Sequence, residues 1–349
     1  MKGFLDGKLF NTALVLFRYT KIELLQMDIR SINLELMKKY YLLTTILLTV
    51  IYCQAQNTAD LLDKLRYNTD KNNYGIQPTF YYPTEISIND YPVFRGLEFF
   101  GNTIPNFIDI AINKSGEQEL KILIDLTNYK KQAQPILKIL LVKSGKGVSI
   151  ISNESDFPKE NILVKFELSD DGITQDNIKN GYFLKTIKFD AKIPVEQPSL
   201  EKSVQLKAST ELLDQLYNAI TKLTDALNNK NNSSVLAIIQ NAEFEVAQLR
   251  GMEKEWMLNE RKALLSNNFK LLPKDSCEVK IYGNGKIATL VKKNSGIIKQ
   301  SAITSEFTEK YPKGKVTQFY NFYYNLPKGK EELELIRFDG YAITKYGNK

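Results

Sequence analysis

Hydrophobic and polar residues alternate in short runs through the first half of the chain. The alternating runs are residues 85–88, 107–112, 120–126 and 162–168. A period of two is typical of strands that bury one face, and short strands separated by glycine- and serine-containing turns favour an antiparallel sandwich. We therefore expect residues 76–198 to form an antiparallel β-sandwich domain, which ends at a proline-containing boundary near residues 194–198.

After residue 209 the hydrophobic period changes to about 3.6, as in a helix with one apolar face. The residues that share this face in the first expected helix are Leu212, Leu213, Leu216, Ile220, Leu223 and Leu227. Ser209 is a suitable N-cap for that helix. We expect Ser233 or Ser234 to open a second helix, Gly251 to end it, and residues 252–265 to form a third.

From residue 277 onwards the pattern returns to strands. Asn284-Gly285 lies between two alternating runs and predicts a hairpin with a two-residue type I′ turn. The expected register pairs Ile281 with Ala288, with the apolar face of the hairpin buried and the other face polar. The sequence thus predicts an α+β fold: an N-terminal antiparallel β-sandwich, then helices on a curved antiparallel sheet in residues 199–349.

A three-part export signal precedes these patterns. Lys38 and Lys39 are followed by an apolar run over residues 40–52 and by small residues that suit cleavage between Ala55 and Gln56. The apolar run is shorter than the roughly 20 residues that cross a bilayer. We therefore expect residues 37–55 to be a signal peptide, no transmembrane span after cleavage, and a periplasmic or secreted mature chain.

Two points about the leader stay open. The signal begins at Met37, so residues 1–36 are interpreted as an upstream segment outside the native protein, or else as a long first part of the same signal. Cys53 could carry a lipid anchor instead, although Tyr52 departs from the small residue that usually precedes a lipidated cysteine. Residues 56–75 are expected to be a short helix and a linker.

Composition narrows the chemistry. The chain has no histidine, which excludes Ser-His-Asp relays, Cys-His relays and histidine-ligated zinc. Its net charge of +7 is spread along the chain without a basic cluster interleaved with aromatics, so no nucleic-acid partner is predicted. Cys277 is expected to be a buried small side chain.

No motif predicts a catalytic residue, a cofactor or a metal ion. Gly283-Asn284-Gly285-Lys286 lacks the spacing of a phosphate-binding loop and is better explained as the hairpin turn. The acidic residues between Asp170 and Asp176 lack the EF-hand spacing for calcium and are interpreted as a solvated loop.

An aromatic run in the last third of the chain is its most unusual feature. On a strand, Phe319, Asn321 and Tyr323 would face one way, and Tyr320, Phe322 and Tyr324 the other. Such a row could line a ligand cavity or dock a partner, or it could be ordinary core packing. The residues that we consider for a ligand or partner surface are Phe319, Tyr320, Phe322, Tyr323, Tyr324 and the single tryptophan, Trp256.

Residues 219–231, with their short Asn/Lys break, resemble the first helix of nuclear-transport-factor-two-like domains, and the resemblance extends over most of residues 209–345. It implies helices followed by a curved sheet. Catalytic members of that group hold an Asp/His or similar pair inside the sheet, so without histidine the resemblance implies a non-catalytic or ligand-binding member. The leader and the Lys-, Asn- and Ile-rich composition resemble secreted proteins of Bacteroidetes-type bacteria.

The leading functional hypothesis is a non-enzymatic cell-envelope module that binds a protein or a small ligand. One alternative is an enzyme that uses two carboxylates on envelope glycans, which requires an acidic pair in one cleft. Another is a periplasmic immunity-type inhibitor of a toxin.

Overall fold

The structure is a computed structural model, in which Asp60–Lys349 is one structural unit. The residues it describes are 60–65, 73–97, 101–102, 105–131, 135–144, 150, 153–193, 196, 199–309 and 314–346. The expected signal peptide, its Ala55/Gln56 cleavage site and Cys53 lie outside these residues. So does the proline boundary at residues 194–198, apart from Glu196.

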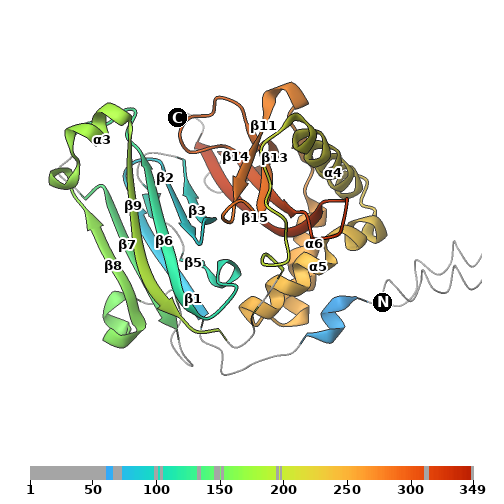
Figure 1. Ribbon diagram of the computed structural model, residues 1–349, viewed down its shortest axis with the longest axis horizontal. Helices are drawn as coiled ribbons and strands as arrows, with labels where there is room; N and C mark the ends of the chain where they lie inside the picture. The colour runs from blue at the N-terminus through green and yellow to red at the C-terminus, as the bar shows by residue number, and fades with distance from the viewer. Residues whose placement is uncertain are drawn as a thin grey trace, which may run out of the picture. The chain divides into compact units, whose positions relative to one another are not determined.

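Two antiparallel sheets form the first part of the described chain (Figure 1). One sheet has the order β4 (Gly101–Asn102), β1 (Asn73–Phe80), β7 (Leu137–Ser144) and β8 (Ile162–Leu168), with β5 (Asn106–Phe107) also on β1. The other has the order β3 (Tyr91–Gly96), β2 (Thr84–Ile88), β6 (Gly116–Asp125) and β9 (Tyr182–Ala191). Alternate side chains of both sheets meet in one sandwich core, which includes Ile76, Ile86, Ile122, Ile139 and Leu141.

Short helical turns interrupt this part. They are the 3₁₀ helices η2 (Asp109–Ala111), η3 (Glu154–Asp156), η4 (Lys159–Asn161) and η5 (Asp170–Gly172) and the α-helix α3 (Gln175–Asn180). The strand expected over residues 107–112 is therefore wrong beyond Phe107. Its apolar residues form a turn instead, because the buried Asp109 carboxylate accepts a 3.3 Å hydrogen bond from the Tyr74 amide and fixes η2 against β1.

Three helices follow: α4 (Thr210–Asn228), α5 (Asn232–Arg250) and α6 (Lys254–Ser266). The Ser209 hydroxyl accepts from the Leu212 amide at 3.1 Å, which confirms the expected N-cap of α4. Helix α5 is capped by Asn231 rather than by a serine, since the Asn231 side chain accepts from the Ser234 amide. Gly251 ends α5 in the left-handed conformation, as expected.

A six-stranded antiparallel sheet completes the fold. Its path is β10 (Phe269–Leu271), β13 (Ile303–Glu309), β14 (Gly314–Asn325), β12 (Ile287–Lys292) and β11 (Cys277–Tyr282), and β15 (Glu334–Tyr346) also pairs with β14. The 3₁₀ helix η6 (Lys274–Ser276) precedes β11. One face of this curled sheet packs on the helices in a helix-side core that includes Leu216, Ile220, Ile239, Leu290 and Phe322. The α+β class with antiparallel sheets is confirmed.

The β11–β12 hairpin has the expected register, with Val279 opposite Leu290 and Ile281 opposite Ala288. Its second face is not polar and exposed, contrary to expectation. Tyr282 and Ile287 belong to the sandwich core, whereas Ala288 and Leu290 belong to the helix-side core. The sheet is therefore covered on both sides, which a period-two pattern in one hairpin cannot reveal.

The expected two-residue turn at Asn284-Gly285 is present, since the Lys286 amide donates to the Gly283 carbonyl at 3.2 Å. Gly283, Asn284 and Gly285 all have positive φ, and the strands close at Tyr282 and Ile287. The β2–β3 turn explains this geometry, since Asp90 accepts from the Gly283 amide through its carbonyl oxygen and from the Asn284 amide through its carboxylate.

No helix in the described part of the chain combines the length and apolar character needed to cross a membrane.

Candidate functional site

The aromatic run lies on β14 with the alternation predicted for a strand. Tyr320, Phe322 and Tyr324 point into the helix-side core and are almost completely buried. Phe269 of β10 packs edge-on against Tyr320, with ring centroids 4.8 Å apart. This row holds the sheet to the helices, so these three side chains contribute to the core and not to a surface.

The opposite face of β14 meets the β-sandwich. Tyr323 is fully buried there, and its ring lies 4.9 Å from that of Tyr91. Phe319 is half-buried and stacks on Tyr341 of β15 at 5.1 Å with the rings nearly parallel. Of the six residues considered for a surface, Tyr320, Phe322, Tyr323 and Tyr324 are thus buried, because both faces of the sheet are covered.

Trp256 is the most exposed member of that set. It lies in the first turn of α6, and 58% of its surface is exposed to solvent. Met257 and Leu264 form the buried side of the same helix, which explains why Trp256, one residue before Met257, points away from the protein.

A buried polar layer lies where the sandwich meets the curled sheet. Arg95 of β3 donates from Nε to Glu85 of β2 at 2.7 Å, from Nη2 to the Tyr282 hydroxyl at 2.7 Å, and from Nη1 to the Tyr323 hydroxyl at 3.3 Å. The Tyr323 hydroxyl in turn donates to Asp339 at 3.2 Å. We call these five residues the Arg95 layer.

Burial raises the pKa values of several groups around the Arg95 guanidinium. Burial raises the pKa of Asp339, and Arg95 together with hydrogen bonds from Asn321 and Tyr323 opposes that shift. Burial also raises the pKa of Tyr282 and Tyr323, so both hydroxyls stay protonated near neutral pH. The layer brings two carboxylates, Glu85 and Asp339, near one arginine, and each of the three guanidinium nitrogens donates one hydrogen bond.

A second buried ion pair ties α5 to the curled sheet and to the sandwich. Arg337 of β15 donates from Nη2 to Glu245 of α5 at 2.9 Å, and from Nε to the Ile110 carbonyl of η2 at 3.3 Å. Glu245 also accepts from the Ser199 hydroxyl. The Glu245 carboxylate therefore helps to hold α5, β15 and the segment at Ser199 together, and it is not free for acid–base chemistry.

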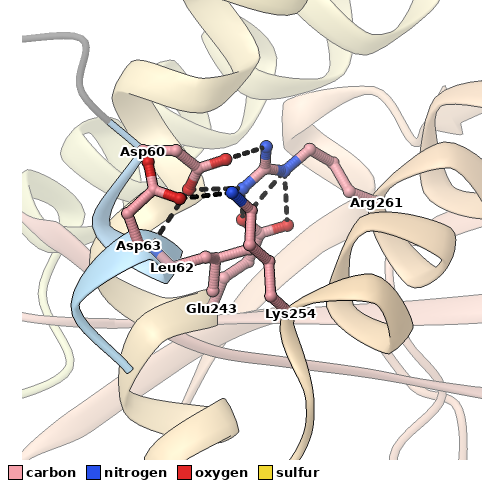
Figure 2. Close-up of polar contacts among 6 residues, drawn as sticks. All are labelled: Asp60, Leu62, Asp63, Glu243, Lys254 and Arg261. Atoms are coloured by element: carbon pink, nitrogen blue, oxygen red, sulfur yellow. Dashed lines mark hydrogen bonds and ion pairs between the residues drawn. The ribbon is translucent and has the colours of Figure 1, made fainter. Parts of the chain in front are cut away.

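A third cluster holds the first described turn of the chain (Figure 2). Arg261 of α6 lies between two carboxylates: it donates to Asp60 at 2.8 Å and to Glu243 of α5 at 2.5 Å. Lys254 binds Asp63 of the 3₁₀ helix η1 (Leu61–Lys64). Leu62 of η1 packs in a small apolar cluster with Ala247 and Met257, so η1 is attached to α5 and α6 by both charge and burial.

The pKa values of this cluster follow from burial and from Arg261. Burial opposes ionisation of Asp60, but hydrogen bonds from Arg261 and the Leu62 amide outweigh it and lower the pKa of Asp60. Glu243 is only 1% exposed, and burial raises its pKa despite the same arginine. The arginine pKa is raised, because two carboxylates outweigh the cost of its burial.

Sequence reasoning identified none of these clusters, although one signal was present. Arginine is rare here: the chain has seven arginines among 47 basic residues. The four that lie among the described residues are Arg95, Arg250, Arg261 and Arg337. Three of them bind a carboxylate, and Arg250 lies over the Phe107 ring at 4.8 Å. Guanidinium groups suit buried and stacked sites better than ammonium groups do, so each arginine was a candidate for such a site.

The described residues contain no group of three or more acidic or cysteine side chains arranged to hold a metal ion. In the acidic loop, Asp170 accepts a 2.8 Å hydrogen bond from the Tyr129 hydroxyl. Cys277 is buried, and burial raises the pKa of its thiol.

Helix α3 and the start of β9 lie together in the sandwich (Figure 1), and they carry exposed apolar side chains. We define this β9 patch as Ile178, Tyr182 and Leu184, which are 38%, 39% and 47% exposed. Gly181 ends α3 with positive φ and turns the chain directly into β9. The Asn177 side chain donates to the Tyr182 carbonyl, which fixes α3 against the beginning of the strand.

Three of the six large apolar side chains that are exposed among the described residues belong to this patch. Scattered exposed apolar residues need no explanation, but a group within seven residues on a sheet edge is typical of interaction sites.

Comparison with known proteins adds no assignment: no protein-family model, no curated protein and no solved structure matches this chain significantly.

Proposed function

We propose that the mature chain is a non-enzymatic, extracytoplasmic binding module and that its partner is an envelope protein held at the β9 patch. The observation that carries the proposal is the concentration of Ile178, Tyr182 and Leu184 at one exposed edge. A sheet edge with side chains of this size offers a surface for another protein, since it combines apolar area with main-chain hydrogen-bonding groups.

The expected maturation is compatible with this fold. Cleavage between Ala55 and Gln56 leaves the whole Asp60–Lys349 unit on the mature chain. The retained chain then begins four residues before Asp60, which Arg261 binds. Export therefore leaves every described residue on the mature chain, which agrees with the proposed periplasmic or secreted location.

The contacts of the buried carboxylates favour binding over catalysis. Glu85 is bound by Arg95, Glu243 by Arg261, and Glu245 by Arg337. Asp339 accepts from Asn321 and Tyr323. A carboxylate enzyme for envelope glycans would need an acidic pair that is free to contact the substrate. We therefore favour the binding function over this enzymatic alternative. An immunity-type inhibitor is one form of the proposed module.

We keep the nuclear-transport-factor-two-like resemblance of residues 209–345 as part of the proposal. Three helices on one face of a curled sheet support it. In that arrangement the inner aromatic row, Tyr320, Phe322 and Tyr324, fills the space beneath the helices, which agrees with a member that has no catalytic pair.

Photo-crosslinking in intact cells tests the proposal. A photoreactive phenylalanine analogue replaces Leu184 in one variant, Trp256 in a second and the exposed Glu211 in a third. We expect a discrete protein adduct at position 184 and none at 211, and we expect the adduct to disappear when Tyr182→Ser and Ile178→Ser are added. An adduct at 256 alone would place the binding surface on α6 instead. Equal labelling at all three positions would contradict a specific partner.

A further inference from the structure

Strand β9 lies at the end of its sheet and pairs, within the described chain, with β6 only. The direction of its main-chain groups follows from one bond beside the ladder: the Leu126 amide donates to the Gly181 carbonyl at 2.7 Å. In an antiparallel pair, hydrogen-bonded and non-hydrogen-bonded positions alternate. With the register Asp125↔Tyr182, the odd-numbered residues of β9 bond to β6 and the even-numbered ones point outwards.

Two further bonds confirm this alternation. The Asp125 amide donates to the Pro83 carbonyl, so the odd-numbered residues of β6 face β2 and its even-numbered residues face β9. The Tyr182 carbonyl, which points outwards, accepts from the Asn177 side chain. The amide and carbonyl groups of Leu184, Thr186 and Lys188 therefore form a free edge, with no hydrogen-bond partner among the described residues.

Apolar and charged side chains occupy defined positions along this edge. Tyr182 and Leu184 lie on the outer face of the sheet, next to the free amides. Lys188, on the same face, forms an exposed ion pair with Glu117 of β6 at 2.8 Å. Lys185 lies on the opposite face, is exposed, and has no ion-pair partner within the described ranges.

We propose that the partner binds by adding an extended segment to β9 as a further strand, with apolar side chains beside Tyr182 and Leu184 and an acidic side chain beside Lys185. This inference rests on the proposed function, because it specifies how the β9 patch is used. A row of free main-chain donors and acceptors can pair with another extended backbone. The charge of Lys185 favours a segment that carries an acidic side chain.

Pairing of β9 with β9 of a second copy would leave Lys185 without an acidic residue opposite it. Opposite residues of an antiparallel pair place their side chains on the same face of the sheet. The only acidic residue of β9 is Asp190, which lies on the face opposite to that of Lys185. No antiparallel self-pairing through the free edge can therefore place Asp190 opposite Lys185. Lysines on edge strands are a common device against self-association.

Amide hydrogen exchange on the full mature chain tests the inference. The probe is a ten-residue peptide of alternating valine and glutamate, and the control is alternating valine and lysine. We expect the amides of Leu184, Thr186 and Lys188 to exchange at least about tenfold more slowly with the glutamate peptide, while the odd-numbered amides of β9 are already protected without it. Only strand addition protects alternate residues in this way.

Two substitutions separate main-chain from side-chain binding. Thr186→Pro removes an outward amide that the fold does not use, so it should abolish peptide binding, whereas the matched Thr186→Ala should retain it. Lys185→Glu should weaken binding of the glutamate peptide by at least about threefold and favour the lysine peptide. The exchange pattern in the unmodified protein remains decisive if Thr186→Pro does not fold.

The outcomes distinguish the two proposals. If the crosslink at position 184 depends on the patch but no alternate protection occurs, strand addition is wrong and the proposed function stands. If neither the crosslink nor the protection is found, both are wrong. Concentration-dependent protection of the even-numbered amides without peptide would identify a second copy as the occupant and overturn the acidic partner.

Discussion

The guanidinium of Arg95 and the hydroxyl of Tyr282 are joined by a 2.7 Å hydrogen bond across 187 residues of sequence. Arg95 belongs to a sandwich strand and Tyr282 to the curled sheet, so this bond lies at the contact between the two β-structures. Around it the contact is both polar and aromatic, since the buried Tyr91 and Tyr323 rings pack together beside the Arg95 layer. The contact between the sandwich and the curled sheet thus depends on directional hydrogen bonds as well as on burial of apolar surface.

Replacing Arg95 should strongly destabilise the protein. Arg95→Met leaves the mostly buried Glu85 without its cation, and the expected loss in the free energy of unfolding is about 3–5 kcal/mol. Chemical denaturation measures it. Lys138→Met is the matched control, because the Lys138–Glu167 pair is exposed, and it should change stability by less than about 0.5 kcal/mol. Similar small effects from both variants would contradict a structural role for the Arg95 layer.

The stability contribution of Asp339 should depend on pH in a defined direction. Its pKa in the folded protein is raised above the usual 3.8, so the folded state holds this proton more tightly than the unfolded state. That contribution is full below about pH 4 and is lost as the pH rises through the raised pKa. Urea unfolding at several pH values should therefore show the wild type losing stability relative to Asp339→Asn as the pH increases.

Tyr323→Phe provides the companion measurement. The Tyr323 hydroxyl donates to Asp339 and lowers its pKa, so its removal should raise that pKa further and extend the pH-dependent loss to higher pH. A pH profile that is the same in all three proteins would show that Asp339 does not titrate in this range.

The Arg261 cluster should control access to the first turn of the described chain. Arg261→Met removes the cation between Asp60 and Glu243 (Figure 2), and η1 should then detach more often from α5 and α6. Limited trypsin digestion should cleave after Lys64 faster in this variant. Lys262→Met, at the neighbouring exposed position, should leave the rate unchanged. Equal rates in both variants would mean that burial of Leu62 alone holds η1.

The same cluster predicts an acid-sensitive attachment. The pKa of Asp60 is lowered in the folded protein, so its contribution is present above about pH 4 and is lost as the pH falls through the lowered value. Asp60→Asn should remove this acid dependence, measured as the rate at which an acid-active protease cuts the chain near η1. Persistence of the dependence in Asp60→Asn would assign it to another group.

Cys277 should react with thiol reagents only after unfolding. The thiol is fully buried, and burial raises its pKa, so both access and the thiolate fraction are low. Mass spectrometry of the mature chain after iodoacetamide treatment should show no label in buffer and one label in denaturant. Rapid labelling in buffer would indicate that the η6–β11 region opens in the native state.

Much of the local structure could be predicted from the sequence, because local preferences act over a few residues. Ser209 specified the start of α4, Gly251 the end of α5, and the alternation around Ala288 the register of the hairpin. The alternation of the aromatic run was correct for the same reason: side chains on a strand change face at every residue.

The candidate site could not be predicted, because its members come from distant segments. Glu85, Arg95 and Asp339 each occupy an ordinary strand position, and only the packing of two sheets brings them together. Whether Tyr323 is a surface or a core residue likewise depends on what covers the second face of its sheet, which the period of its own strand does not encode.

The sequence by itself determined the α+β class, the order of sandwich and helix-covered sheet, and the absence of histidine chemistry. Tertiary structure alone decided that both faces of the curled sheet are buried, that three of the four described arginines bind carboxylates, and that β9 keeps a free edge beside Leu184. The physical reason is range: helix and strand periods are set by neighbouring residues, whereas desolvation, ion pairing and edge exposure are set by segments that meet only in the folded chain.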